Sequence, residues 1–336
     1  MQVAVTGATG LVGANLVAAL NHAGHAVRAT RRPASDTSPL DGMQVEWCDA
    51  TLSDPAALTR AFEGAEWVFH CAAAVTAKRR VEPWMVEANV EGTRNVVQAC
   101  RAVGVRRLLH CSSTVSVGLG RDGVPADESS PWNLAAAGLD DGYATTKRRA
   151  EELVLAEVAK GLDAVIVNPG YMFGPYDSRP SSGKLLLSVV RGAVPGCSAG
   201  KNSFVDVRDV VEGMIAAAER GRSGERYILA GHNLGYAELF ARIAEVAGTR
   251  PITRVIPRWL AAIPGLWGDL QERLMGTEPL LSSNTIAWGY EPNFIMSSEK
   301  ARRELGYAPR PIEEGIAAAL TWFREAGVVG PLPNFP

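Results

Sequence analysis

Short apolar runs and longer helical patterns alternate along the first half of the chain. Six runs have the length and apolar content of buried strands: residues 2–7, 25–30, 44–49, 66–73, 106–113 and 163–169. The segments between them, such as 11–24 and 90–104, have apolar residues at helical spacing and end in glycine, as helices commonly do. This alternation predicts an α/β fold, a Rossmann-type doubly wound parallel sheet with helices on both faces.

The pattern changes near residue 170. Pro, Gly and Ser cluster in 169–202, and strand and helix patterns then return briefly. The remaining sequence predicts helices and loops and contains several Trp residues. We therefore expect a smaller, mostly helical C-terminal lobe that caps the sheet and binds substrate. The predicted division assigns 1–167 and 203–231 to a dinucleotide-binding domain, and 168–202 and 232–336 to the substrate lobe.

The most apolar late segment, 255–268, is interrupted by two prolines and an arginine. It could lie on a membrane surface, but the pattern favours a core or pocket-lining helix. No run reaches the roughly 18 apolar residues that a membrane span needs.

Composition excludes several classes of protein. The 34 Lys and Arg nearly balance the 36 Asp and Glu among 336 residues, so no nucleic-acid surface is expected. Five cysteines without a CxxC pair argue against a disulfide scaffold or a metal site and fit a reducing compartment. With no secretory signal pattern at the start, we expect a cytoplasmic protein.

A glycine-rich turn, TGATGLVG, directly follows the first predicted strand and precedes a helix. Glycines there let the backbone approach a pyrophosphate, and the helix N-terminus supplies N–H groups. The alternative is a merely tight turn between strand and helix. The candidate residues of the turn are Gly7, Thr9, Gly10, Leu11, Val12 and Gly13.

Arg31 and Arg32 stand at the end of the second predicted strand, where NAD-binding folds place an acid on the ribose. An arginine there offers the 2′-phosphate of NADP a charge-assisted contact, and Ser35 adds a hydroxyl. The alternative is a solvated basic loop. We expect NADP (NADPH) as the cofactor, with NAD less favoured.

Tyr143 and Lys147, in YATTK, share one face of a predicted helix. A nearby ammonium favours the phenolate, so we expect a lowered Tyr143 pKa and a usable acid/base. Ser112 and Ser113 end a strand that faces the same crevice, where a serine can hold the substrate oxygen. Alone, the YxxxK pattern also occurs as an exposed pair.

Together with HCAA, ANVEGTRN, CSS and NPGYMFGP, these motifs resemble the extended short-chain dehydrogenase/reductase family. The resemblance implies catalytic Ser113, Tyr143 and Lys147, with Lys147 also on the nicotinamide ribose. It implies further cofactor contacts from Asp49, Ala50, Cys71, Ala72, Ala73, Asn89, Pro169 and Gly170. From the residues alone, Cys71 and His70 could be strand core and Asn89 a helix cap.

Three departures set the chain apart from sugar-nucleotide members of the family. Arginine replaces the acid after the second strand, Asn168 and Tyr171 replace the arginine and asparagine of RxxNxxGP, and no acidic pair follows Ser113. The chain is more similar to the dihydroflavonol-reductase-like branch, and within it to bacterial hopanoid-associated sugar epimerases. The shared segments include DGVPADESSP, FVDVRDVVEG and SSEKARRELGYAPRPIEEGI.

The substrate pocket is expected to be fairly apolar. Tyr171, Met172 and Phe173 should face the crevice, although they could equally pack the interface of the lobes. Thr76 lies in the loop after HCAA and is a further candidate, beside a basic run that could simply be solvated.

These patterns predict an NADP-dependent carbonyl reductase or alcohol dehydrogenase. Hydride would move between nicotinamide C4 and a small carbonyl or alcohol substrate, and Tyr143 would move the proton. A nucleotide-sugar epimerase with a retained cofactor and a non-catalytic NADP-sensing module are the alternatives. The family also implies a homodimer.

Overall fold

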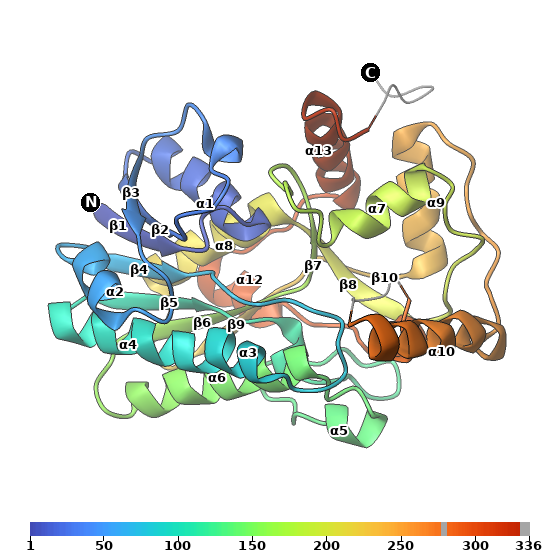
Figure 1. The fold of residues 1–336 in the computed structure, drawn as a ribbon, viewed down its shortest axis with the longest axis horizontal. Helices are drawn as coiled ribbons and strands as arrows, with labels where there is room; N and C mark the ends of the chain where they lie inside the picture. The colour runs from blue at the N-terminus through green and yellow to red at the C-terminus, as the bar shows by residue number, and fades with distance from the viewer. Residues whose placement is uncertain (277–280, 330–336) are drawn as a thin grey trace.

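The computed structural model describes residues 1–276 and 281–329, and it contains the predicted parallel sheet (Figure 1). Seven strands lie in the order β3-β2-β1-β4-β5-β6-β9, and every neighbouring pair is parallel. The strands are β1 (Gln2–Thr6), β2 (Ala26–Arg31), β3 (Val45–Asp49), β4 (Trp67–His70), β5 (Arg107–Cys111), β6 (Ala164–Pro169) and β9 (Arg226–Leu229). The order reverses between β1 and β4, so ligand is expected beyond the carboxyl ends of these strands.

Helices cover both faces of this sheet. On one face lie α1 (Leu11–His22), α8 (Val207–Arg220) and α12 (Glu299–Leu305); on the other lie α2 (Pro55–Phe62), α4 (Gly92–Val103) and α6 (Gly142–Val158). Val3 and Val5 of β1 pack on the first face and Ala4 on the second. Because both faces are buried, the strands read as continuous apolar runs, and the predicted fold class is confirmed.

A second, three-stranded sheet lies beside the first, in the order β10-β8-β7. Its strands are β7 (Tyr171–Phe173), β8 (Lys201–Asp206) and β10 (His232–Gly235). The remaining helices are α3 (Pro83–Val86), α5 (Leu134–Ala137), α7 (Gly183–Val190), α9 (Tyr236–Ala247), α10 (Arg258–Met275), α11 (Ser283–Gly289) and α13 (Ile312–Glu325). The later part of the chain is thus less purely helical than expected, because strands this short show little alternation. The exact division into two lobes stays a prediction.

α10 departs from the expectation for residues 255–268. Its large apolar side chains point outward: Trp259 is 72% exposed and Trp267 is 69% exposed. The interpretation as a core helix is therefore wrong. Within the described residues, no helix has the length and apolar content that crossing a membrane requires.

Candidate active site

The turn after β1 brings the backbone into close contact with its neighbours. Gly7 has a φ of +74°, and a Cβ there would lie 2.6 Å from the backbone nitrogen of Ala72. A Cβ on Gly13 would lie 2.1 Å from the carbonyl oxygen of Gly7. Gly10 precedes α1, and no side chain caps the first turn of this helix. With Thr9, Leu11 and Val12, the turn therefore offers open N–H groups at a helix N-terminus, which suits a pyrophosphate.

The predicted 2′-phosphate residues gather where β2 and β3 end. Arg31 is already engaged, since its Nε lies 2.9 Å from Oδ1 of Asp49 and its guanidinium lies over Trp47. Arg32 is exposed, and among the described residues its side chain makes no ion pair. The Ser35 hydroxyl accepts a hydrogen bond from the Arg32 N–H. Of the two arginines, Arg32 is therefore the free cation.

The loop after β4 is tied to both the glycine turn and the helix α6. The N–H of Cys71 donates to the carbonyl oxygen of Thr6, and the N–H of Ala72 donates to the Thr6 hydroxyl. Residues 71–73 therefore run alongside Gly7, at the middle of the expected cofactor site.

Asn89 holds the same loop from the other side. Its Oδ1 accepts from the N–H of Ala74 at 2.7 Å, while its Nδ2 donates to the carbonyl oxygen of Ala74 and the hydroxyl of Thr146. Asn89 lies inside a π-helical turn, Glu87–Glu91, so the interpretation as a helix cap is wrong. Such turns often occur at functional sites.

His70 belongs to the core. Its ring nitrogens bond the hydroxyls of Thr6 and Thr93, at 2.8 and 3.0 Å. Burial lowers the pKa of His70 to about 3, with a contribution from Lys147, so the ring is neutral. This arrangement fixes β4 between β1 and α4.

Ser113 and Tyr143 meet beyond the carboxyl end of β5. The Ser113 hydroxyl lies near enough to Tyr143 to lower the pKa of the tyrosine, while the hydroxyl of Ser112 is engaged by Ser116 at 2.9 Å. Ser113 has an extended backbone and caps a short 3-10 turn. The structure thus brings the later serine of the pair to the tyrosine.

The electrostatics of Tyr143 differ from the expectation. Burial raises the pKa of Tyr143 well above its usual value, and the Ser113 hydroxyl only partly opposes this rise. The Nζ of Lys147 donates to the carbonyl oxygen of Cys111 at 2.6 Å. The predicted lowering of the Tyr143 pKa by Lys147 is therefore absent, because desolvation outweighs it.

A buried carboxylate, which the sequence analysis missed, lies one turn beyond Lys147. Glu151 has no exposed surface; its Oε1 accepts from Arg226 at 2.8 Å and its Oε2 from Nδ2 of Asn168 at 2.9 Å. Nδ2 of Asn168 also donates to the carbonyl oxygen of Ser113. Burial lowers the pKa of Lys147, and the charge of Glu151 counters this effect. The i, i+4 spacing after Lys147 was the available signal.

The back of the crevice is close-packed. A Cβ on Gly170, after Pro169, would lie 2.6 Å from the carbonyl oxygen of Ser203. Phe173 is buried and stacks on Phe204, so it fits the packing alternative rather than a substrate contact.

The other predicted substrate residues are also held in place by the protein. The Tyr171 hydroxyl donates to the carbonyl oxygen of Ser182, and Met172 packs against the core of the large sheet. Thr76 is buried, and its hydroxyl accepts from the N–H of Lys78. Contact of Thr76, Tyr171 and Met172 with substrate stays a prediction.

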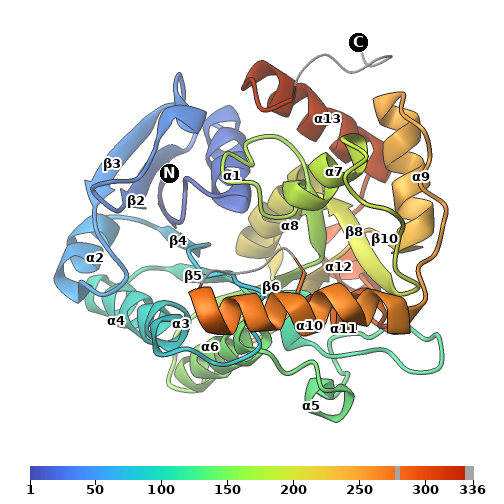
Figure 2. The ribbon, with the colours of Figure 1, turned by 45° about the vertical axis from the view of Figure 1, so that its right-hand side comes forward.

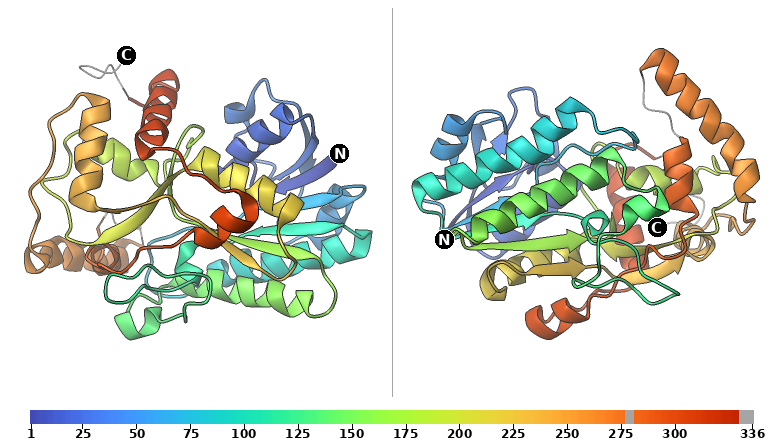
Figure 3. Two further views of the ribbon diagram at one scale, coloured as in Figure 1. Left: turned by 180° about the vertical axis from the view of Figure 1, so that it is seen from behind. Right: turned by 90° about the horizontal axis from the view of Figure 1, so that it is seen from below.

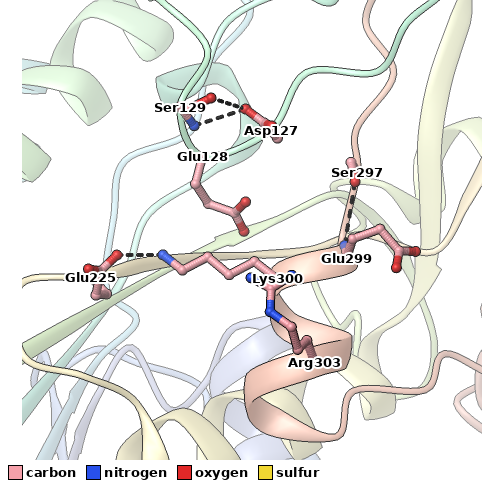
Figure 4. A pocket seen from close by; sticks show the side chains of 8 residues that line it. All are labelled: Asp127, Glu128, Ser129, Glu225, Ser297, Glu299, Lys300 and Arg303. Carbon is pink, nitrogen blue, oxygen red and sulfur yellow. Dashed lines mark hydrogen bonds and ion pairs between the residues drawn. The ribbon is translucent and has the colours of Figure 1, made fainter.

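A separate polar hollow of about 360 Å³ lies away from these residues (Figure 4). Lys300 pairs with Glu225 at 2.5 Å, and Glu128 accepts from the backbone N–H of Ile228 at 2.9 Å. The hollow is lined by Asp127, Glu128, Ser129, Glu225, Ser297, Glu299, Lys300 and Arg303. The segments DGVPADESSP and SSEKARREL thus brace the edge strand β9, through Glu128 on the N–H of Ile228 and Lys300 on the carbonyl oxygen of Arg226.

Comparison with known proteins places this site in context. The pattern of the NAD dependent epimerase/dehydratase family matches residues 3–230. The chain is 35% identical to sterol demethylase protein B of Methylococcus capsulatus, over 98% of this chain and 100% of that protein. It is 31% identical to a Synechocystis protein named "Putative dihydroflavonol 4-reductase", over 97% and 95% of the two chains.

Solved structures agree with these relatives. The structure of gox2253 has a TM-score of 0.84 at 37% identity and covers 98% of this chain and 99% of that one. A nucleoside-diphosphate-sugar epimerase from Pseudomonas aeruginosa has a TM-score of 0.81 at 28% identity, with the same coverage. Over nearly its full length, the chain is thus similar in sequence to a protein named as a reductase and in structure to one named as an epimerase.

Proposed function

Because the chain belongs to the NAD dependent epimerase/dehydratase family, we propose that it is an NADP(H)-dependent oxidoreductase. It interconverts a carbonyl group and an alcohol on a small, fairly apolar substrate. The observation that carries this proposal is the placement of three groups at the carboxyl end of β5. Tyr143 and Lys147 lie four residues apart on α6, the Nζ of Lys147 donates to the carbonyl oxygen of Cys111 at 2.6 Å, and Ser113 follows two residues later, near Tyr143.

The residues present fit a nicotinamide dinucleotide. The turn of Gly7, Gly10 and Gly13 is tight enough that a Cβ at Gly7 or Gly13 would collide with neighbouring backbone atoms, and such a turn before a helix N-terminus suits a pyrophosphate. Arg32 is free to meet a 2′-phosphate, which supports NADP over NAD. When bound, the nicotinamide supplies or accepts a hydride.

Tyr143 acts as the acid in the reducing direction. Its raised pKa keeps the hydroxyl protonated, so it can donate that proton to the oxygen of a carbonyl being reduced. Ser113 holds the same oxygen by a hydrogen bond from its hydroxyl. In the oxidising direction, Tyr143 must first lose its proton, so alcohol oxidation is expected to need more alkaline pH than reduction.

Lys147 and Glu151 position the groups that take part in this proton transfer. The ammonium of Lys147 is held by the carbonyl oxygen of Cys111, the last residue of β5 and two residues before Ser113. The charge of Glu151 opposes the desolvation that lowers the pKa of Lys147, and Asn168 links Glu151 to the backbone of Ser113. The acid, the oxygen-holding serine and the lysine thus form one connected unit.

The rival function is epimerisation of a nucleotide sugar, which the Pseudomonas neighbour favours by its name. That reaction oxidises and re-reduces one carbon and leaves no net change in the cofactor. The absence of the family's sugar-nucleotide residues at Asn168 and Tyr171 favours the reductase.

The test follows NADPH absorbance with a panel of ketones and aldehydes. Wild-type protein should oxidise NADPH with at least one carbonyl, and Tyr143→Phe should lose turnover by a factor of about 10² or more while it still binds NADPH. Tyr290→Phe, at a tyrosine whose hydroxyl only bonds the carbonyl oxygen of Ile256, is the matched control. Full activity of Tyr143→Phe would contradict the proposal.

A further inference from the structure

The outer face of α10 is an unusual apolar surface. Six of its large apolar side chains are at least 60% exposed, among them Met275, and at about 100° per residue the other five fall on one side of the helix. These five side chains are Trp259 (72%), Ile263 (60%), Leu266 (65%), Trp267 (69%) and Leu274 (75%), with Leu260 and Leu270 beside them. A soluble protein rarely leaves a contiguous apolar patch of this kind uncovered unless the patch binds something.

Small residues form the opposite side of α10. Gly265 and Gly268 are buried, and a Cβ on Gly265 would lie 2.4 Å from the side chain of Ile286 in α11. The helix can therefore pack on α11 while its large apolar side chains point away. Figure 2 shows α10 lying across the front of the molecule, and the right-hand view of Figure 3 shows it at the outer edge.

The side of α10 that faces the protein connects the helix to the active-site region. Lys78, in the loop after β4, pairs with Glu272 of α10 at 3.7 Å. Asn284 of α11 bonds the carbonyl oxygen of Ala77 and the carboxylate of Asp141, which caps α6. α10 is thus anchored, through α11 and this loop, to the helix that carries Tyr143.

The charges around the face are cationic. Arg254, Arg258 and Arg273 are exposed and make no ion pair among the described residues. Of the described acids of α10, Glu272 pairs with Lys78, whereas Asp269 accepts from the neutral N–H of Ser283 and keeps its charge, so the three arginines outnumber the uncompensated acid. The whole chain carries a net charge of −2, so the positive charge around this face does not reflect a basic protein as a whole.

We infer that the face of α10 docks on the surface of an anionic phospholipid bilayer. Tryptophans and leucines flanked by arginines suit the boundary between headgroups and acyl chains, and the arginines complement anionic headgroups. A second copy of this chain fits less well. In an antiparallel two-fold pair, Arg258 of one helix would face Arg273 of the other, and like charges would repel.

Docking would place the region around the loop after β4 against lipid. If the proposed function holds, the consequence is that the carbonyl or alcohol substrate is a membrane-soluble molecule. The docking itself is measured without turnover, so its failure and the failure of the proposed function can be told apart.

The experiment is flotation of the full-length protein with vesicles of phosphatidylcholine alone or mixed with phosphatidylglycerol. We expect binding to the anionic vesicles that added salt weakens. Trp259→Ser combined with Trp267→Ser should abolish binding, and each of Arg258→Glu and Arg273→Glu should weaken it about fivefold or more. The control is Arg302→Glu with Arg303→Glu on α12, at cations that lie next to acids.

All substituted side chains are at least partly exposed, so the variants should fold, and circular dichroism checks this. Failure to float with either vesicle would overturn the inference, as would binding that the α10 variants leave unchanged. A dimer in light scattering that the tryptophan variant converts to monomer, without vesicle binding, would assign the face to a second copy instead.

Discussion

At the residue scale, the two adjacent arginines after β2 differ in what they can do. Arg31 is neutralised by Asp49 and lies over Trp47, whereas Arg32 has no partner of opposite charge among the described residues. The sequence pattern treated them as equivalent. The structure assigns the free cation to Arg32, so the two substitutions should have different effects.

We predict that Arg32→Ala weakens NADPH binding about tenfold or more, because a charge-assisted contact to the 2′-phosphate is lost. Binding of NADH should change little. Both affinities can be measured by fluorescence titration.

Arg31→Ala provides the informative comparison. This substitution leaves the carboxylate of Asp49 without its arginine, and that carboxylate would repel the 2′-phosphate of NADPH. Adding Asp49→Asn should therefore restore part of the NADPH affinity that Arg31→Ala loses. Equal losses for NADPH and NADH in Arg32→Ala would contradict the assignment.

His110 is a second residue with a specific consequence. It is buried, both ring nitrogens lack a hydrogen-bond partner among the described residues, and burial lowers its pKa well below the usual value. The folded state therefore keeps His110 neutral. Below about pH 6.5 the unfolded chain takes up a proton that the folded chain does not, so stability is present at neutral pH and falls as the solution is acidified.

We predict that His110→Leu makes this acid-induced loss shallower, by up to about 1.4 kcal/mol per pH unit. At neutral pH the free energy of unfolding should be unchanged or higher, since an unsatisfied polar group is replaced by an apolar one. Urea unfolding at a series of pH values measures both effects. His22→Leu, at an exposed histidine, is the control, and an unchanged slope in His110→Leu would show the account of His110 to be wrong.

At the scale of elements, one face of α6 holds the candidate catalytic residues Tyr143 and Lys147, and the buried carboxylate of Glu151 follows one turn later. Tyr143, Lys147 and Glu151 follow one another at intervals of four residues. Glu151 connects this helix to Arg226 on β9 and to Asn168 on β6. The helix is therefore fixed to the strands by a buried ion pair.

Glu151→Gln should lower the free energy of unfolding by about 3–5 kcal/mol, because it leaves the largely buried Arg226 without its counter-charge. Glu152→Gln, on the same helix, breaks an exposed pair with Arg148 and should cost about 0.5 kcal/mol or less. Chemical denaturation compares the two. Similar small losses in both variants would mean that the buried pair contributes little.

At the scale of the whole molecule, the elements that could be predicted are those whose burial leaves a regular pattern of apolar residues in the sequence. Strands buried on both faces must be continuously apolar, so β1 to β6 could be read from the sequence. β7 has three residues, too few to show a period. The exposure of α10 could not be read either, because apolar content does not say which neighbours cover a helix.

The candidate site divides in the same way. Ser113, Tyr143 and Lys147 stand in recognisable motifs, and the structure places them near the carboxyl end of β5; their catalytic role stays a prediction. Glu151 pairs with Arg226, which is 75 residues away in the sequence, so no local sequence pattern predicts this pair. The raised pKa of Tyr143 depends on how deeply the folded chain encloses it, which spacing along a helix does not reveal.

The most direct test of the central claim is to unfold the purified protein gently, identify any nucleotide released, and titrate fresh protein with NADPH and NADH. The account predicts that any nucleotide is NADP in readily exchangeable form and that NADPH binds about tenfold or more tightly than NADH. Tightly retained NAD would contradict the assignment of Arg32 to a 2′-phosphate, and it would make the nucleotide-sugar epimerase the better explanation of this site.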